Sequence, residues 1–228
     1  MYFDNTNAIS GVEKWVTGTN SSVPAMYNVP QCRGLAIDVN NVLYCSMGDF
    51  DQVVAKSLSS TQSTLAIVAG TGCRGSAANM LSFPHGIFVD TNLDLYVADC
   101  YNNRIQLFRS GQSNGITVAG SGSTNVTITL YHPTDVILDA DRYFFIVDHG
   151  NNRIVGSGPN GFRCVAGCSR LRGVASNLLY NPQRLAFDNY GNIYVTDWKN
   201  NRIQKFLLLN NTLSKYCKIC LLRANIDI

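Results

Sequence analysis

One short motif recurs three times in this chain, and its even spacing constrains the fold more than any other feature. An aspartate precedes the arginine of an Asn-Arg-Ile triplet by five positions, in "DCYNNRI" (99–105), "DHGNNRI" (148–154) and "DWKNNRI" (197–203). Each copy follows the previous one after 49 residues. A fixed period of this length is typical of a repeat protein, in which each repeat is one supersecondary unit.

The repeat extends beyond this motif and includes a fourth, weaker copy. The core segments are "GLAIDVNNVLYCS" (34–46), "GIFVDTNLDLYVAD" (86–99), "DVILDADRYFFIVD" (135–148) and "RLAFDNYGNIYVTD" (184–197). Their first aspartates are Asp38, Asp90, Asp139 and Asp188, spaced 52, 49 and 49 residues apart. A proline precedes three of these segments, at Pro84, Pro133 and Pro182.

Each unit reads as four short strands. Val, Ile, Tyr and Phe dominate segments such as "GIFVD", "LYVAD", "RIQLF" and "ITVAG", and Gly, Asn and Ser dominate the breaks between them. No segment shows helical periodicity over a dozen residues. Four antiparallel strands in about 50 residues are typical of one β-propeller blade, and such sheets bury their faces only by stacking side by side. The sequence therefore predicts an all-β propeller.

We expect one propeller domain over residues 1–228, with about four four-stranded blades. The predicted blade cores lie near 34–70, 86–120, 135–167 and 184–208, with an extra outer strand at 12–17 and a tail at 218–228. The strand at 12–17 could complete the last blade and close an irregular small ring. The alternative is an incomplete, open arc, which we favour because both ends depart from the pattern. An open arc would expose apolar sheet faces and could self-associate.

The units resemble NHL repeats, whose pattern is a proline, an apolar strand ending in Asp, a turn, "lYvaD", and then "NNRi". Residues 84–108, 133–155 and 182–206 match this pattern closely. Residues 32–54 match it in part, because Cys32, Met47 and Gln52 replace the proline, the second Asp and the Arg. The resemblance covers residues from about 12 to about 217 and implies a propeller. NHL propellers typically have six blades, and they serve many functions.

The recurring Asp and Arg pairs are interpreted as a structural joint rather than as three copies of one active site. The pairs are Asp99 with Arg104, Asp148 with Arg153, and Asp197 with Arg202. Each pair flanks a short loop, so the two side chains can meet, and a guanidinium can also bind the loop carbonyls. A feature repeated in every intact unit is better explained by blade assembly than by catalysis.

Composition excludes some function classes and indicates a compartment. With 14 % charged residues the chain is not disordered, and its apolar runs are too short to span a bilayer. A net charge of +3 with scattered arginines does not suggest a nucleic-acid partner. Eight cysteines and N-x-S/T acceptors at Asn20, Asn125 and Asn210 favour an extracellular glycoprotein, although "MYFDNTNAIS" has no signal-peptide features.

The cysteines predict one disulfide and leave other pairings open. Cys164 and Cys168 in "RCVAGC" could close a small disulfide loop. Cys32 and Cys73 both precede inner strands of neighbouring blades, so a bridge between them is conceivable. Cys45 reads as a small buried apolar residue. Cys217 and Cys220 form a lone C-x-x-C, which is a weak zinc signal without a second such pair.

The three histidines carry the alternative that the protein is an enzyme. "FPHGIFVD" at His85 resembles the setting of a zinc ligand in peptidyl-hydroxyglycine amidating lyases, which have a related propeller. The equivalent positions in the next blades are Thr134 and Gln183, and His132 and His149 lie elsewhere in the repeat. One matching ligand cannot hold a catalytic zinc. We therefore expect no metal, no cofactor and no metal-dependent lyase or hydrolase activity.

The variable loops favour a binding or scaffold function. The Asp-to-Arg loops and the long connections into each inner strand would gather aromatic, amide and basic residues on one rim, which suits peptide or glycan contact. The candidates are Arg74, Tyr101, Asn102, His149, Asn151, Arg170, Arg172, Trp198, Lys199 and Asn200. We expect a protein partner, with a glycan as second choice. NHL propellers also select protein or RNA targets for tripartite-motif ubiquitin ligases, and this chain could be the recognition part of such a system.

Overall fold

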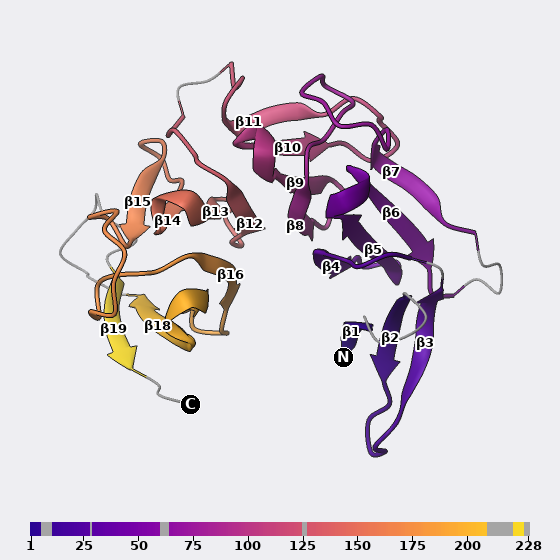
Figure 1. The fold of residues 1–228 in the computed structure, drawn as a ribbon, viewed down its shortest axis with the longest axis horizontal. Helices are drawn as coiled ribbons and strands as arrows, with labels where there is room; N and C mark the ends of the chain where they lie inside the picture. The colour runs from indigo at the N-terminus through magenta and orange to yellow at the C-terminus, as the bar shows by residue number, and fades with distance from the viewer. Residues whose placement is uncertain (6–10, 28, 60–63, 125–126, 209–220, 226–228) are drawn as a thin grey trace.

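The computed structural model of the 228-residue chain describes residues 1–5, 11–27, 29–59, 64–124, 127–208 and 221–225. These residues form five antiparallel sheets, which follow one another around an arc (Figure 1). The structure is thus an all-β propeller of small sheets, as the sequence predicts, but with five blades rather than about four.

The N-terminal sheet has three strands, and the other four sheets have four strands each. In every four-stranded sheet the strands pair in chain order, with the first strand at the inner side of the arc (Figure 1). The strands of the five sheets are, in order, β1 Tyr2–Asn5, β2 Gly11–Trp15 and β3 Ser22–Tyr27; β4 Gly34–Ile37, β5 Val42–Met47, β6 Gln52–Ser57 and β7 Ala66–Gly70; β8 Pro84–Val89, β9 Leu95–Asp99, β10 Arg104–Phe108 and β11 Ile116–Gly120; β12 Pro133–Leu138, β13 Phe144–Asp148, β14 Arg153–Gly156 and β15 Arg163–Ala166; β16 Pro182–Phe187, β17 Ile193–Asp197, β18 Arg202–Leu208 and β19 Leu221–Asn225.

Both ends of the chain differ from the sequence-based prediction. Residues 12–17 were expected to be an extra outer strand, which in one of the two alternatives completed the last blade. Gly11–Trp15 is instead the middle strand of the separate N-terminal sheet. The predicted tail at 218–228 contains β19, which pairs with β18 and gives the last blade its outer strand. The fifth blade was missed because the N-terminal sheet contains neither the proline nor the Asp-to-Arg motif.

The first aspartate of each repeat shapes the turn between the first and second strands of its blade. Asp38 Oδ1 accepts hydrogen bonds from the backbone N–H groups of Asn40 and Val42, at 2.8 and 2.9 Å. Asp188 Oδ1 accepts the equivalent bonds from Tyr190 and Asn192, each at 2.9 Å. Aspartate is favoured at such positions because its side chain can bond the backbone two residues later. This local bond explains why the residue recurs.

A bulge in the outer strand is shared by the first four sheets. The extra residue is Val118 of β11, opposite Ile105 and Gln106, in the third sheet, and Ala25 of β3, opposite Val12 and Glu13, in the N-terminal sheet. An extra residue at a bulge bends the strand and increases its twist. The shared bulge identifies the N-terminal sheet as another unit of the same kind.

Apolar side chains between neighbouring sheets form the core. One cluster joins the third and fourth blades through Ala98 and Ile105 on one side and Val136 and Ile146 on the other. Equivalent clusters fill the other three boundaries. Alternate residues of each strand point to opposite faces, so a central blade is apolar on both faces. The blades are therefore stabilised by their neighbours, and among the described residues no blade covers the outer face of either end blade.

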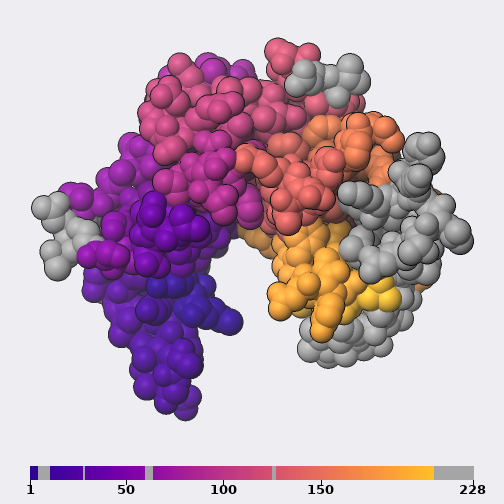
Figure 2. All heavy atoms as spheres, turned by 180° about the vertical axis from the view of Figure 1, so that it is seen from behind, coloured from indigo at the N-terminus to yellow at the C-terminus, as the bar shows by residue number. Residues whose placement is uncertain are grey.

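The space between the first and last blades is open. Figure 2 shows a notch between the indigo N-terminal sheet and the orange C-terminal sheet. Of the two arrangements considered from the sequence, the structure has the open arc. None of the described residues forms a helix long and apolar enough to cross a membrane.

Candidate functional site

One face of the propeller carries the short helical turns that contain the repeated motif. This face runs across several blades, at the edge where the second strand of each blade ends and the third begins. The four 3₁₀ turns are η1 Gly48–Phe50, η2 Cys100–Asn102, η3 His149–Asn151 and η4 Trp198–Asn200. Each joins the second strand of a blade to the third. The connections 71–83 and 167–181 pack beside η2 and η4, through bonds such as Asn102 Nδ2 to the Gly75 carbonyl at 2.8 Å. We call the surface formed by these turns and connections the loop face.

The repeated Asp and Arg residues form a buried ion pair in each of the last three blades. The distance from the arginine Nε to the aspartate Oδ2 is 2.7 Å for Arg104, 2.7 Å for Arg153 and 2.8 Å for Arg202. The guanidinium also donates to carbonyls of the incoming connection, as Arg104 does to Ser76, Ala77 and Met80. The pairs therefore tie each connection to its own blade, as the structural interpretation predicts.

The asparagines that the sequence assigned to a binding surface belong to this joint. The side-chain amides of Asn102, Asn151 and Asn200 donate to the aspartate of the same loop, at 2.8, 2.9 and 2.8 Å. Asn200 donates in addition to the carbonyl of Gly173 at 2.8 Å. Their donors point into the protein, so these three residues support the loop face rather than forming its outer surface.

A second joint links neighbouring blades and was not foreseen. The residue before each motif arginine has a left-handed backbone. In the third and fourth blades its side-chain oxygen accepts a backbone N–H from the connection into the next blade. The bonds run from His132 to Asn103 at 2.8 Å and from Asn181 to Asn152 at 2.9 Å. Asn and Asp tolerate this backbone conformation better than other non-glycine residues. The second Asn of "NNR" was the available signal.

The outer surface of the loop face carries a stack of aromatic rings and cations between the second and fourth blades. Phe83 and Tyr101 stack with ring centroids 4.7 Å apart, and the guanidiniums of Arg33 and Arg74 lie over Phe83 and Tyr101 at 5.0 and 5.7 Å. Tyr101 is 5.4 Å from the ring of His132. We call these five residues the aromatic–cation stack. Because Tyr101 is 49 % exposed, the stack is open to solvent.

The last blade presents a second, smaller group of the same chemistry. Lys199 lies 4.3 Å from the Trp198 ring centroid, and Arg172 lies 5.6 Å from that of Tyr180. Trp198 is 48 % exposed, and Arg170 is also exposed. Of the predicted binding residues, Arg74, Tyr101, Arg170, Arg172, Trp198 and Lys199 therefore lie where a partner could touch them. Sequence reasoning missed Arg33, Phe83 and His132.

Polar side chains of the inner strands form a hydrogen-bonded cluster on the inner side of the arc. His85, Thr134 and Gln183 hold equivalent positions, and the next positions are Gly86, Asp135 and Arg184. Arg184 Nη1 donates to His85 Nδ1 at 2.7 Å and to the Thr134 carbonyl at 2.8 Å, and its Nη2 donates to the Arg33 carbonyl. Arg184 thereby connects three inner strands. Repeat analysis missed Asp135 and Arg184 because this position is not constant: it holds glycine in two blades, aspartate in one and arginine in one.

Burial and nearby cations hold His85 in its neutral form. Burial lowers the pKa of His85 to about 3, and Arg184, Arg33 and His149 act in the same direction. Arg184 can only donate to Nδ1 of His85, whereas the Thr134 carbonyl, 3.1 Å from the same nitrogen, can only accept and raises the pKa. Burial raises the pKa of Asp135 to about 6, against the effects of Arg184 and the Leu185 N–H. His149 Nδ1 contacts the Pro182 carbonyl at 2.9 Å.

These shifts predict a pH dependence of stability. The unfolded state binds a proton at His85 below about pH 6.5, whereas the folded state does so only near pH 3, so acidification favours unfolding by up to about 1.4 kcal/mol per pH unit. Asp135 has the opposite effect between about pH 6 and 3.8: acidification raises the free energy of unfolding, because the folded form binds the proton more tightly.

We expect the stability difference between wild type and His85→Gln to shrink from pH 7 to pH 4 in urea titrations. A difference independent of pH would contradict a neutral His85.

The structure contains two disulfides among the described residues. Cys164 and Cys168 are bonded, as predicted. Cys32 is bonded to Cys45 rather than to Cys73, because pairing of β4 with β5 brings the start of one strand beside the other. Cys73 is an exposed free thiol, and burial raises the pKa of the free Cys100 thiol to about 12. Cys217, Cys220, Asn125 and Asn210 lie outside the described residues.

Two further features bear on ligand binding. Among the described residues no three His, Cys, Asp or Glu side chains form a group that could hold a metal ion.

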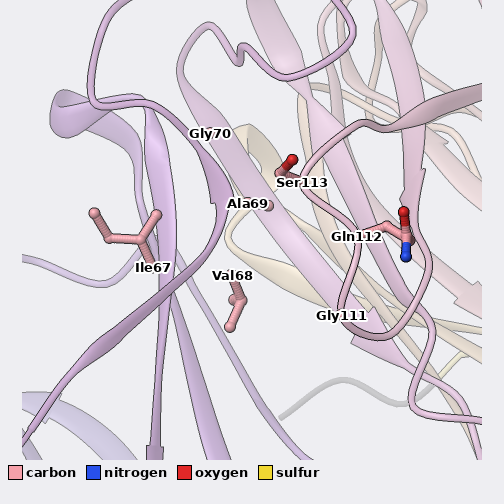
Figure 3. Close-up of a pocket in the computed structure, with 7 residues that line it drawn as sticks. All are labelled: Ile67, Val68, Ala69, Gly70, Gly111, Gln112 and Ser113. Carbon is pink, nitrogen blue, oxygen red and sulfur yellow. The ribbon is translucent and has the colours of Figure 1, made fainter.

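A shallow pocket of about 310 Å³ lies at the outer rim, between β7 and the loop that joins β10 to β11 (Figure 3). It is lined by Ile67, Val68, Ala69, Gly70, Gly111, Gln112 and Ser113. No charged residue lines it.

Comparison with a family model decides the identity of the repeat. The model described as "NHL repeat" matches residues 81–108 and 179–206. The chain is a β-propeller that contains NHL repeats. The two matches coincide with the third and fifth blades from the incoming connection to the third strand, which is the part held by the Asp and Arg joint. No curated protein sequence matches the chain.

Solved structures share the fold of this NHL propeller at low sequence identity. A chain in a nidogen/laminin complex has a TM-score of 0.65 and 18 % identity, over 86 % of this chain and 67 % of that one. A catalytically inactive virginiamycin B lyase from Staphylococcus aureus, solved with quinupristin, has a TM-score of 0.61 and 14 % identity, over 95 % and 63 %. A protein described as a putative gluconolactonase has a TM-score of 0.57 and 14 % identity, over 85 % and 62 %. This chain therefore spans about two thirds of the length of these three structures.

Proposed function

We propose that this NHL propeller is a non-catalytic binding module whose loop face recognises a protein partner. The observation that carries the proposal is the aromatic–cation stack, in which Tyr101 lies exposed between Phe83, Arg74 and His132. Tyrosine, tryptophan and arginine dominate the energetics of protein interfaces, because they bury large rigid surfaces and still offer polar contacts. The stack is already ordered by its own contacts, which reduces the entropy lost on binding.

The charges of the loop face support a partner segment with acidic and aromatic residues. Arg170, Arg172 and Lys199 add exposed basic groups to the loop face. The nearby carboxylates, Asp49 and Asp51, already pair with Arg33 and Arg74 at 3.5 and 3.4 Å. An excess of positive charge speeds association with an acidic partner and disfavours a basic one.

The repeat and inner-strand residues support binding rather than catalysis. The motif aspartates are fully buried in ion pairs, and burial and Arg184 hold His85 in its neutral form. The nidogen/laminin structure contains a propeller of this fold in a protein–protein complex. A glycan is the second candidate ligand, because the exposed rings of Tyr101 and Trp198 could stack on sugar faces.

Substitution of Tyr101 provides the test. We expect Tyr101→Ala to weaken binding of partners captured by the wild-type protein by about 30-fold, the usual effect of removing an aromatic hot spot. The matched control is Tyr190→Ala, because Tyr190 is 83 % exposed in the turn between β16 and β17, at the opposite end of the blade. The measurement is quantitative affinity capture with mass spectrometry, followed by titration of the purified partner.

Three outcomes would contradict the proposal. Partners retained equally by Tyr101→Ala would place the binding surface elsewhere, and equal loss with Tyr190→Ala would indicate a nonspecific effect. Chemical conversion of the captured ligand by the wild-type protein would favour the enzyme alternative.

A further inference from the structure

The connection 167–181, which leads from β15 to β16, presents two exposed aliphatic side chains on the loop face. Leu171 is 66 % exposed and Val174 is 77 % exposed. Single exposed apolar residues are common on protein surfaces, so exposure alone indicates no function. These two residues lie on one loop, however, and the connection into the third blade is an equivalent loop with different side chains at both positions.

The fold does not require apolar residues at these two positions. The connection 71–83 is held by the same joint, because the motif arginine of its blade donates to the Ser76 carbonyl at 2.8 Å, as the equivalent arginine does to the Val174 carbonyl at 2.7 Å. Cys73 and Ser76 stand where the later connection has Leu171 and Val174. Both are exposed, although the third blade has a neighbour on each side. Exposure therefore belongs to these loop positions, and the aliphatic side chains are particular to the connection 167–181.

The backbone that carries the two aliphatic residues is already hydrogen-bonded to its own blade. Asn200 Nδ2 donates to the Gly173 carbonyl at 2.8 Å. Arg202 donates from Nη1 to the Val174 carbonyl at 2.7 Å and from Nη2 to the Ala175 carbonyl at 3.1 Å. Moving a polar backbone group out of water is costly unless it is hydrogen-bonded. This part of the loop can therefore enter a less polar environment with these three carbonyls still paired.

The charged side chains around these residues are basic. The segment 163–187 contains four arginines and no aspartate or glutamate. Arg170 and Arg172 are exposed on the connection, and Lys199 is exposed on the neighbouring turn η4. The carboxylate of Asp197, just before η4, is fully buried in the ion pair of its blade. Exposed aliphatic side chains flanked by cations are typical of surfaces that bind anionic membranes.

We propose that the connection 167–181 docks the propeller on the surface of a bilayer that contains anionic phospholipid. Leu171 and Val174 enter the boundary between the headgroups and the acyl chains, and the three exposed basic side chains contact lipid phosphate groups. The positive charge is complementary to an anionic lipid surface, and the aliphatic residues supply the apolar contact that holds a loop there. This inference does not rest on the function proposed for the aromatic–cation stack, which involves other residues.

Co-sedimentation of the full chain with lipid vesicles tests the inference. The vesicles contain phosphatidylcholine and phosphatidylserine in a ratio of about seven to three, or phosphatidylcholine alone. We expect wild type to bind the mixed vesicles and to bind phosphatidylcholine vesicles much more weakly. The double variant Leu171→Ser with Val174→Ser imitates the polar connection 71–83 and should reduce binding to the mixed vesicles at least about tenfold. Because both side chains are exposed, the variant should keep the wild-type stability in urea denaturation.

Two further variants complete the test. Val39→Ser is the matched control, because Val39 is 69 % exposed in the turn between β4 and β5, at the end of the blade opposite the loop face, and it should bind as wild type does. Arg170→Gln with Arg172→Gln should weaken binding to the mixed vesicles about 20-fold, since each basic side chain near an anionic surface contributes about 1 kcal/mol.

Four results would overturn the inference. The first is a wild-type protein that does not bind the mixed vesicles, and the second is equal binding to phosphatidylcholine alone. The third is an equal loss of binding in Val39→Ser and in the Leu171 and Val174 double variant. The fourth is a loss confined to the arginine variant, which would indicate a purely electrostatic surface that suits an acidic protein instead of a membrane.

Discussion

Replacing Arg153 with methionine is expected to lower the free energy of unfolding by about 3–5 kcal/mol. Its side chain is 2 % exposed, its Nε donates to Asp148 Oδ2 at 2.7 Å, and its Nη2 donates to the Thr129 carbonyl at 2.7 Å. Removing the guanidinium leaves a fully buried carboxylate that keeps only hydrogen bonds from Asn151 and the Tyr131 N–H. An uncompensated buried charge is among the largest single destabilising effects in proteins. Urea denaturation monitored by fluorescence measures the loss.

The chain contains a matched control for this substitution. Arg202 makes the same pair with Asp197 in the last described blade, but its side chain is 21 % exposed, because no further blade packs against it among the described residues. We expect Arg202→Met to cost clearly less than Arg153→Met, because solvent can reach the remaining carboxylate. Equal losses at the two sites would contradict the view that burial between blades makes the pair important. The double variant Asp148→Asn with Arg153→Met should recover part of the loss.

Replacing Gly86 with alanine is expected to cost about 3 kcal/mol or more, because the added methyl group has no space. A Cβ atom on Gly86 would lie 2.0 Å from Asp135 Oδ1 and 2.7 Å from the Thr134 carbonyl oxygen. The second contact is with backbone, so a change of rotamer cannot relieve it. The inner strands β8 and β12 would have to separate on the inner side of the arc.

Gly158→Ala is the control for this prediction. A Cβ atom on Gly158 would meet no other atom within 4 Å, so its replacement should change the free energy of unfolding by less than about 1 kcal/mol. Thermal and urea denaturation of the two variants should separate them widely. Similar stabilities would indicate that the inner strands are not packed as closely as the structure has them.

The sequence predicts the repeated parts of this molecule well, because repetition separates structural residues from chance. Four of the five blades and the pairing of Asp148 with Arg153 follow from spacing alone. The N-terminal sheet could not be predicted in this way. Its strands "YFDN", "GVEKW" and "SVPAMY" retain the alternation of a sheet but lack the motif residues.

Residues that differ between repeats were harder to place. Asp135 and Arg184 occupy one repeat position together with Gly86, and no periodic rule connects a glycine, a carboxylate and a guanidinium. Their relation appears only when the inner strands converge on the inner side of the arc. The Cys32–Cys45 disulfide was missed for a similar reason, because the register of β4 on β5 decides it. The aromatic–cation stack combines residues from three blades, and sequence spacing identified only Arg74 and Tyr101 among them.

The bonds of Arg184 have a mechanical consequence. This side chain reaches from the last inner strand to the carbonyl of Arg33, just before the first described inner strand, and so acts as a tie across the open side of the arc. In a closed ring, contact between the first and last blades fixes the position of every blade around the centre, whereas the blades of an open arc can shift relative to one another. The hydrogen bonds of Arg184 restrict this movement. Loss of Arg184 should therefore let the arc open or tighten as a whole while each blade keeps its own geometry.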